Sequence, residues 1–394
     1  MKWIHGDRAI VGDGKKVVSP AWVGVENDKI LTVTSEKPTI NENDVIEDYG
    51  DVTITPGLMN VHDHICRKAL REPDQDIPRK FRTKALMESD PSYIMLHSVR
   101  NSKLALNEGI TWIRDYGLGD LTSIHLKRGI EEGLIEGPEI STCGFPICQT
   151  GGHTHKQARE ADGVDDVRRA VREQIKSGAD VIKFMASGGL NTFPRPETFN
   201  VEFSEEELKA GIDAAHDLGA QTAAHAYPKE AIMRILRAGI DSVEHGAHLD
   251  EECIELMVKN GTVFVPTHIS TIKGPWTIYE TELKEQLLLP QQKAIRLAKE
   301  ANIPIGAGTD TSGYLADEIR ELGKVLEESP VEALAHATGT AAKIARRPDL
   351  GLIEEGKIAN IAIFKGDLTR SLDNLDNAIQ VWKKGKKMLP TIEG

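Results

Sequence analysis

The segment Pro56–His64, which reads PGLMNVHDH, determines how the rest of the chain is interpreted. Together with the apolar residues before it, this segment predicts a buried strand over residues 53–62. His62 and His64 follow at its far end, and side chains at positions i and i+2 of a strand point the same way. Two imidazoles that project together could hold a metal ion, provided that other strands supply further ligands.

The composition is typical of a soluble globular protein, since 40% of the 394 residues are hydrophobic and 28% are charged. The net charge of −13 argues against a nucleic-acid partner, because phosphate binding requires clustered Lys and Arg. No signal-peptide core opens the chain, and no run approaches the ~20 apolar residues of a membrane span. The four cysteines lack CxxC spacing, which indicates a reducing compartment. We therefore expect a cytoplasmic homo-oligomer that acts on a small molecule and binds neither nucleic acid nor membrane.

Short apolar strands alternate with longer helical patterns through most of the chain. Besides 53–62, strands are predicted over 110–116, 139–144, 180–186, 221–226, 241–246, 262–267 and 304–309. Helices are predicted over segments that include 92–108, 164–177, 204–218, 228–238, 250–260 and 284–301. Eight strands that alternate with helices indicate an α/β fold, a (β/α)8 TIM barrel. A doubly wound open sheet is the alternative.

The two ends of the chain have a different pattern of predicted secondary structure, with short β-like runs and turns but no helix pattern. We expect residues 1–52 and 356–394 to form one small β-sandwich domain beside a barrel of residues 53–355. Two long loops, 65–91 and 268–283, follow strand ends. Loops at that end of a barrel line the active site, so both are candidate lids, with ordinary surface loops as the alternative.

Four further polar residues lie at or near the ends of predicted strands, namely Lys183, His225, His245 and Asp310. With the two histidines of the first strand they make six such residues on five strands, which packing does not readily explain. Neutral imidazoles suit zinc, and carboxylates suit zinc or harder metals. Burial lowers the pKa of a lysine, and its neutral amine can add carbon dioxide to become a carbamate. A salt-bridged or snorkelling lysine is the alternative interpretation of Lys183.

This pattern resembles the amidohydrolase superfamily. The resemblance rests on the His-x-His of strand one, the strand-four lysine, the histidines of strands five and six and the strand-eight aspartate. The segments GGH at 151–153, IKFMASGG at 182–189 and HAY at 225–227 are similar to the imidazolonepropionase-related branch, which includes Xaa-Pro dipeptidases and related carboxypeptidases. Two positions depart from the usual acidic residues, since Asn60 precedes the His-x-His and Asn360 lies in the tail. Neither departure removes a ligand.

The resemblance implies two divalent metal ions, with zinc expected, bridged by a carboxylated lysine. The implied ligands are His62, His64, Lys183 as N6-carboxylysine, His225, His245 and Asp310. It also implies a binuclear metal-dependent hydrolase that attacks amide bonds with a metal-bridging hydroxide. In this scheme the Asp310 carboxylate is the catalytic proton shuttle. N-acyl amino acids or dipeptides are the expected substrates.

Two further residues are candidates for substrate binding. The resemblance implies that His153 contacts substrate, while Tyr227 shares the inward face with His225 and could bind a substrate carboxylate. We expect His155 to face solvent, and Arg67 and Arg195 are possible carboxylate clamps.

Other activities of the same superfamily remain alternatives. They are cyclic-amide hydrolysis of the imidazolonepropionase or hydantoinase kind, lactone hydrolysis and deamination. Deaminases of the superfamily usually carry a glutamate three residues after the strand-five histidine, where this chain has Pro228. A scaffold without chemistry would lack ligands, and none is missing from the pattern.

Overall fold

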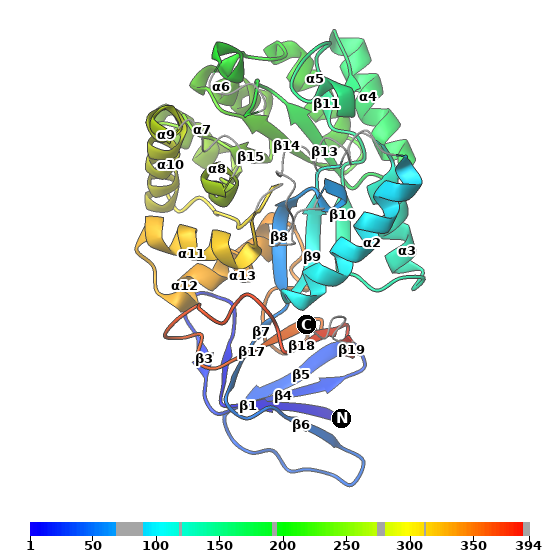
Figure 1. Cartoon of the computed structure of the whole chain (residues 1–394), viewed down its shortest axis with the longest axis vertical. Helices are drawn as coiled ribbons and strands as arrows, with labels where there is room; N and C mark the ends of the chain where they lie inside the picture. Colours follow the sequence, from blue (N-terminus) through cyan, green and yellow to red (C-terminus); the bar gives the residue numbers. More distant parts are fainter. Residues whose placement is uncertain (68–89, 118–119, 191–194, 274–279, 311–312, 389–394) are drawn as a thin grey trace.

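The computed structural model describes residues 1–67, 90–117, 120–190, 195–273, 280–310 and 313–388, and its chain divides into two visibly different parts (Figure 1). In the larger part, strands are surrounded by helices. In the smaller part, both chain ends contribute strands alone. The molecule therefore has an α/β fold with parallel and mixed sheets. None of the helices in the described ranges is long and apolar enough to cross a membrane.

The strands of the larger part pair in parallel, and apart from β12 (Arg159–Glu160) they follow one another in chain order. One sheet contains β8 (Leu58–Asp63), β9 (Ile110–Asp115) and β10 (Glu139–Thr142). A second contains β12 (Arg159–Glu160), β11 (Ile147–Cys148), β13 (Val181–Met185), β14 (Gln221–Ala226), β15 (Ser242–His245) and β16 (Val263–Val265). A doubly wound sheet would reverse the strand order at a switch point, and the β13-to-β16 series has no reversal. The carboxyl ends of these strands lie at one edge.

The predicted strand 304–309 is a less regular segment that connects the two sheets. Ile305 forms a parallel bridge with Phe264 of β16, and Asp310 forms one with Asp63 of β8. The Val61 N–H donates to the Ala307 carbonyl across the same junction. The prediction of a continuous strand is wrong here because only isolated bridges form, yet the segment lies beside both strands.

The predicted strand 53–62 is two strands, which corrects the sequence-based boundary. β7 (Val52–Pro56) joins a sheet of the chain ends, and β8 begins after Gly57. A Cβ at Gly57 would lie 2.4 Å from the side chain of Thr111, so only glycine fits where the chain passes from one sheet to the other. The apolar run is continuous across this point, which conceals the break.

Helices pack around the parallel strands and follow the sequence predictions closely. They are α2 (Pro91–Asn107), α3 (Thr122–Glu131), α4 (Val164–Ser177), α5 (Glu205–His216), α6 (Lys229–Ala238), α7 (Glu251–Asn260), α10 (Leu289–Glu300), α11 (Leu315–Leu326), α12 (Pro330–Ala335) and α13 (Gly339–Ile344). The predicted helix 284–301 is α10 preceded by a π-helical turn at Lys284–Leu288. Gly178 and Gly239 end α4 and α6 in the left-handed conformation that glycine allows.

The two predicted loops differ in outcome. Residues 268–283 are not one loop, because α8 (His268–Lys273) and α9 (Glu280–Leu283) occupy both ends, while 274–279 lie outside the described residues. Of the loop 65–91, a short 3-10 turn at Ile65–Arg67 is described, and residues 68–89 lie outside the described ranges.

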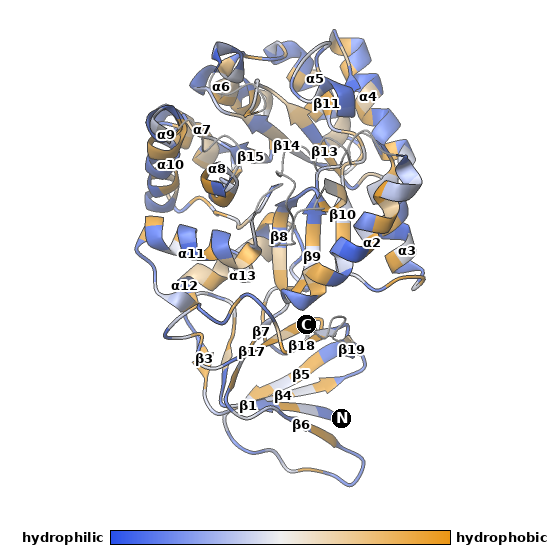
Figure 2. Ribbon diagram, viewed as in Figure 1, coloured by the Kyte–Doolittle hydropathy of each residue, from blue (hydrophilic) through white to orange (hydrophobic). Residues whose placement is uncertain are grey.

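The chain ends form two sheets, and in the second of them strands from both ends pair with each other. One contains β5 (Lys29–Thr34), β4 (Ala21–Glu26), β1 (Lys2–Gly6) and β6 (Val45–Asp48). The other contains β19 (Lys386–Met388), β18 (Gln380–Lys383), β17 (Ile361–Lys365), β7, β2 (Arg8–Ile10) and β3 (Val17–Val18). One buried cluster includes Ile4 and Val23 from the first sheet with Ile54 and Ile361 from the second. Many strand residues in both parts are apolar (Figure 2).

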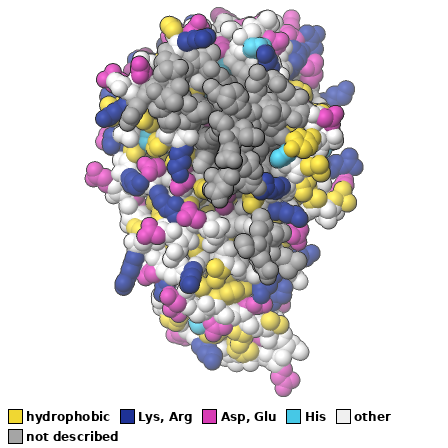
Figure 3. Space-filling model, in the orientation of Figure 1, with side chains coloured by type: hydrophobic (Ala, Val, Ile, Leu, Met, Phe, Trp, Pro, Cys, Tyr) yellow, Lys and Arg dark blue, Asp and Glu magenta, His cyan; other side chains and the backbone are white. Residues whose placement is uncertain are grey.

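Acidic and basic side chains are intermingled on the face that Figure 3 shows, outside the grey atoms. No single-sign area dominates that part of the described surface.

Candidate metal centre

Three of the predicted ligands lie within reach of one ion. The ligand atoms of His62, His64 and Asp310 all lie within 4.8 Å of one another. The Asp310 Oδ1 atom is 3.2 Å from His64 Nε2 and 3.9 Å from His62 Nε2. Two imidazoles and a carboxylate in this arrangement can bind a divalent cation such as zinc.

The other three predicted ligands adjoin this group. The ring centroids of His62 and His245 are 5.1 Å apart, and those of His245 and His225 are 4.6 Å apart. The Lys183 Nζ atom lies 4.1 Å from the ring centroid of Tyr116, which stacks edge-on against His62 at 4.6 Å. The fold therefore brings all six residues into one connected cluster at the strand ends.

Each of the four histidines has one ring nitrogen next to an oxygen acceptor. The pairs are His62 Nδ1 with Glu244 Oε2 (2.6 Å), His64 Nδ1 with the Gly117 carbonyl (2.8 Å), His225 Nε2 with the Gly188 carbonyl (2.9 Å) and His245 Nδ1 with Thr267 Oγ1 (2.7 Å). A carbonyl can only accept, and the Thr267 hydroxyl donates to the Pro266 carbonyl, so the nitrogens are assigned as N–H donors. In a neutral imidazole held in this way, the opposite nitrogen keeps its lone pair. Metal-binding histidines are held by outer hydrogen bonds of this kind.

His62 gives the clearest indication that the cluster fits a metal. Its Nε2 atom is buried and has no hydrogen-bond partner among the described residues. A buried polar atom left without a partner is costly, and such atoms are rare in folded proteins. A cation coordinated by this nitrogen would remove that cost.

Burial keeps three of the imidazoles, those of His62, His225 and His245, in the neutral form. Burial lowers the pKa of His225 and of His245 well below the usual value, and it lowers the pKa of His62 to about 4. Burial also lowers the pKa of Lys183 to about 8, so roughly a tenth of its amine is uncharged at pH ~7. Burial alone would raise the pKa of Asp310, but hydrogen bonding and charge from His64 hold it well below its usual value. Neutral imidazoles and a carboxylate are the forms that bind metal.

The backbone is strained at three positions of this edge. His245, Thr267 and Asp310 have positive φ angles of 69°, 49° and 51°. Such conformations in non-glycine residues cost roughly 1–3 kcal/mol each and are concentrated at functional sites. Here they turn the chain sharply at the points where His245 and Asp310 enter the cluster.

The sequence interpretation missed a buried polar network beneath the histidines. Glu244 accepts hydrogen bonds from His62, Arg114, Tyr116 and Ser242. Burial would raise its pKa, but the positive charge of Arg114 and the His62 contact outweigh burial and lower it to about 2. The sequence did contain a signal for this network, because Arg114 and Glu244 are charged residues inside otherwise apolar predicted strands.

The unusual Asn60 has a clear structural role. Its amide nitrogen donates to Asp63 and to the Thr309 hydroxyl, at 3.0 and 2.8 Å. Its carbonyl oxygen accepts from the backbone N–H groups of His62 and Thr309. The amide therefore ties β8 to the segment that carries Asp310.

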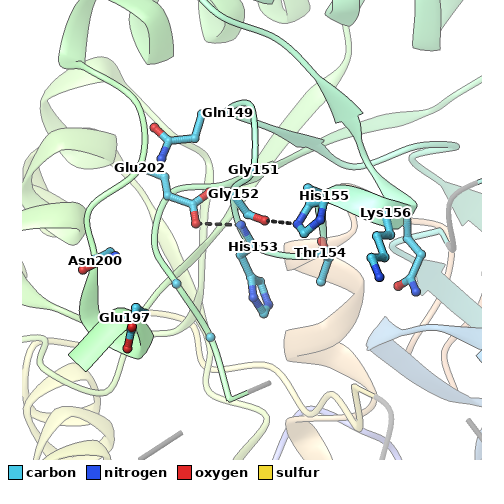
Figure 4. A pocket seen from close by; sticks show the side chains of 13 residues that line it. Gln149, Gly151, Gly152, His153, Thr154, His155, Lys156, Glu197, Asn200 and Glu202 are labelled. Carbon is cyan, nitrogen blue, oxygen red and sulfur yellow. Dashed lines mark hydrogen bonds between the residues drawn. The ribbon is translucent and has the colours of Figure 1, made fainter. Parts of the chain in front are cut away.

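The two predicted substrate contacts also lie at the cluster. The His153 ring stacks on the His225 ring with centroids 4.5 Å apart and planes inclined by 22°. The Tyr227 ring lies 4.9 Å from His225 and 5.4 Å from His245. A cavity of about 410 Å³ opens beside His153 (Figure 4).

The remaining predicted residues are less informative. His155 is exposed, as expected, and its Nδ1 atom lies 3.1 Å from the Gly152 carbonyl. Arg195 is exposed and precedes the 3-10 turn Pro196–Phe199. The Arg67 side chain lies outside the described parts of the structure.

Glu202 lines the same cavity and holds the loop that carries His153. Its Oε1 atom accepts from the His153 backbone N–H at 2.7 Å (Figure 4), while its buried Oε2 atom has no hydrogen-bond partner among the described residues. Burial raises its pKa from 4.5 to about 7 despite this hydrogen bond. Between those pH values the folded state binds more protons than the unfolded state, so the free energy of unfolding falls as the pH rises from about 4.5 to about 7.

Glu202→Gln is expected to remove this pH dependence, because an amide does not ionise and still offers an oxygen to His153. The variant should be more stable than the wild type above pH ~7, by about 3 kcal/mol at most, at about 1.36 kcal/mol for each pKa unit. Denaturant unfolding across pH ~5–8 measures the effect, with the exposed Glu206→Gln as the control. Parallel pH profiles for Glu202→Gln and the wild type would contradict the assignment.

Comparison with known proteins places this geometry in a class of hydrolases. Residues 53–390 match the model of the amidohydrolase family. Ochratoxinase from Aspergillus niger is 29% identical over 431 residues, a match that covers 97% of this chain and 85% of the fungal protein. Imidazolonepropionase from Pyrobaculum arsenaticum is 25% identical, with 92% of this chain and 89% of that protein covered.

A solved structure agrees with these matches. The crystal structure of a Xaa-Pro dipeptidase with bound methionine in the active site superimposes with a TM-score of 0.83 and 26% sequence identity, over 98% of this chain and 99% of the other. The chain belongs to the amidohydrolase family, whose members are hydrolytic enzymes. The resemblance read from the sequence is thereby confirmed.

Proposed function

We propose that this protein is a binuclear metal-dependent hydrolase of amide bonds. The observation that carries the proposal is the set of four buried histidines, each with one nitrogen engaged by an outer acceptor, around the buried Lys183. His62, His64 and Asp310 would hold one divalent ion, and His225 and His245 the other. Lys183, as N6-carboxylysine, would offer an oxygen to each ion. The residue types favour zinc.

Two bound ions would lower the pKa of a shared water molecule and polarise the substrate carbonyl. Asp310 would accept a proton from the attacking water and deliver it to the leaving nitrogen, so that a C–O bond replaces the C–N bond. Its ionised state and its position beside His64 suit this role. The buried Glu244 would keep the His62 ring in one orientation throughout.

N-acyl amino acids or dipeptides are the proposed substrates. The support comes from two similar proteins, one named ochratoxinase and the other a Xaa-Pro dipeptidase solved with methionine in its active site. His153, which lines the cavity, and Tyr227, whose ring lies beside His225 and His245, would bind the substrate. The similarity to imidazolonepropionase favours cyclic-amide hydrolysis as the second candidate. Lactone hydrolysis and deamination are weaker candidates, and Pro228 counts against deamination.

The proposal includes the architecture around the site. The parallel strands with segment 304–310 would form a (β/α)8 barrel over residues 53–355, supported by the backbone hydrogen bonds of that segment to β8 and β16. Residues 1–52 and 356–394 would form a β-sandwich, supported by the buried cluster shared between their two sheets. We also propose a cytoplasmic homo-oligomer; four buried cysteines without disulfides support the reducing compartment.

The test of the proposal combines metal analysis with a substrate screen. Mass spectrometry should find near two divalent ions per chain, and hydrolysis should appear among N-acyl amino acids and dipeptides with varied C-terminal residues. A few hydantoins, imidazolones and lactones belong in the same screen. One ion per chain with activity only on cyclic amides would replace the proposal by the second candidate.

Tyr227→Phe is expected to raise KM for substrates that end in a free carboxylate and to leave their amides unaffected. Burial raises the pKa of Tyr227 well above its usual value, so the hydroxyl remains a donor. One hydrogen bond to a charged group contributes roughly 1.5–3 kcal/mol, which corresponds to roughly 10–150-fold in KM. Steady-state kinetics on matched acid and amide pairs measure the change, with the exposed Tyr93→Phe as the control. Equal effects on acids and amides would show that Tyr227 only packs.

A further inference from the structure

The ends of β15 and β16 are joined by one buried side chain. The Gln291 amide nitrogen, from α10, donates to the His245 carbonyl at 2.9 Å and to the Pro266 carbonyl at 2.7 Å. An amide NH₂ group has two hydrogens, so both are used. Gln291 is only 1% exposed. It therefore fixes the position of His245 relative to the next strand from outside the metal cluster.

The oxygen of the same amide is also engaged. It lies 2.7 Å from His268 Nδ1, at the start of α8. The backbone N–H groups of His268 and Ile269 donate to the Glu318 carboxylate of α11, at 3.0 and 2.6 Å. His268 and Glu318 are both fully buried. The turn after β16 is therefore held by side chains from two helices.

This turn carries the outer acceptor of His245. Thr267 accepts the His245 Nδ1–H through its hydroxyl, and that hydroxyl donates to the Pro266 carbonyl that Gln291 also binds. Both His245 and Thr267 have positive φ angles, a conformation that surrounding contacts must maintain. Gln291 thus holds the backbone of His245 and, through Pro266, the residue that orients the His245 ring.

We propose that Gln291 is a positioning residue for the His245 imidazole. The proposal rests on the proposed function, in which His245 is a ligand of one of two ions. Burying an amide is costly unless its hydrogen bonds are satisfied, and an apolar side chain would fill the same space. Groups that orient metal ligands from outside typically change metal affinity 10–100-fold when they are replaced.

Gln291→Met tests this role because it removes the hydrogen bonds and keeps an unbranched side chain of similar length. The matched control is Gln221→Met, which removes a glutamine-to-carbonyl hydrogen bond, to Ile344, at the opposite end of β14. The measurement is zinc content per chain after equilibration with graded concentrations of a chelator. We expect Gln291→Met to lose one ion at a 10–100-fold lower chelator concentration than the wild type does. The second ion of this variant, and both ions of the control variant, should be lost at the same concentrations as in the wild type.

Three outcomes separate the possibilities. If the wild type and Gln291→Met retain both ions equally, the positioning role is wrong and the proposed function stands. If only the melting temperature of the metal-free protein falls, Gln291 is a packing residue. If the wild type binds no ion, the proposed function itself is wrong. Gln291→Asn, whose amide is one methylene too short to reach both carbonyls, gives the same test if Gln291→Met does not fold.

Discussion

Lys183→Ala is expected to lose bound metal and hydrolytic activity together. Two cations in one cluster require an anionic bridge, because an ammonium repels them and a neutral amine offers one lone pair. In the proposed arrangement Asp310 serves the ion of His62 and His64. Lys183 adjoins the cluster, buried against Tyr116, and its lowered pKa favours the amine that can add carbon dioxide. The carbamate would provide two oxygens and a negative charge.

Rescue by small carboxylic acids is a second test of the bridging role of Lys183. Acetate or propionate should partly restore both metal and turnover in Lys183→Ala, because each can refill the bridging position. Lys183→Glu should keep some metal, since its carboxylate is shorter but anionic. The exposed Lys209→Ala is the control for loss of a lysine. A Lys183→Ala protein with two tightly bound ions and normal turnover would rule out the carbamate and favour another bridging ligand or a single ion.

Asp310→Asn is expected to lose about 10²–10⁴-fold or more in turnover, the range for general acid–base groups. Much of the metal should remain, because the amide oxygen still coordinates and the histidines are unchanged. Turnover and metal content measured on the same preparation separate the two effects. The exposed Asp213→Asn serves as the control, and near-normal turnover in Asp310→Asn would rule out the proton-shuttle role.

The predicted elements were accurate where the chain carries local signals. Gly178 and Gly239 end their helices in the left-handed conformation, and a glycine after a helical pattern is a signal that can be recognised in the sequence alone. The His-x-His pattern and the polar residues at strand ends identified the cluster for a similar reason, since parallel strands bring their carboxyl ends to one edge. The family match then confirmed the superfamily.

Other features depend on contacts between distant segments, which no local pattern records. The division of strand 53–62 at Gly57 follows from its contact with Thr111. Glu244 is 182 residues from His62, and Gln291 is 46 residues from His245. These partners become neighbours only when the strands and helices assemble. Sequence reasoning therefore identified the residues that cluster at the strand ends and missed the side chains that support them.

The pairing of β7 with β17 has a consequence for how the chain folds during synthesis. Thr55 donates to the Ala362 carbonyl across a separation of 307 residues. At roughly 5–20 residues per second, a ribosome needs on the order of 15–60 s to make the intervening chain. During that time β7 lacks its antiparallel partner, and an unpaired strand edge invites pairing with other chains. We therefore expect the strand that leads into the candidate metal centre to need protection from such pairing while the rest of the chain is made.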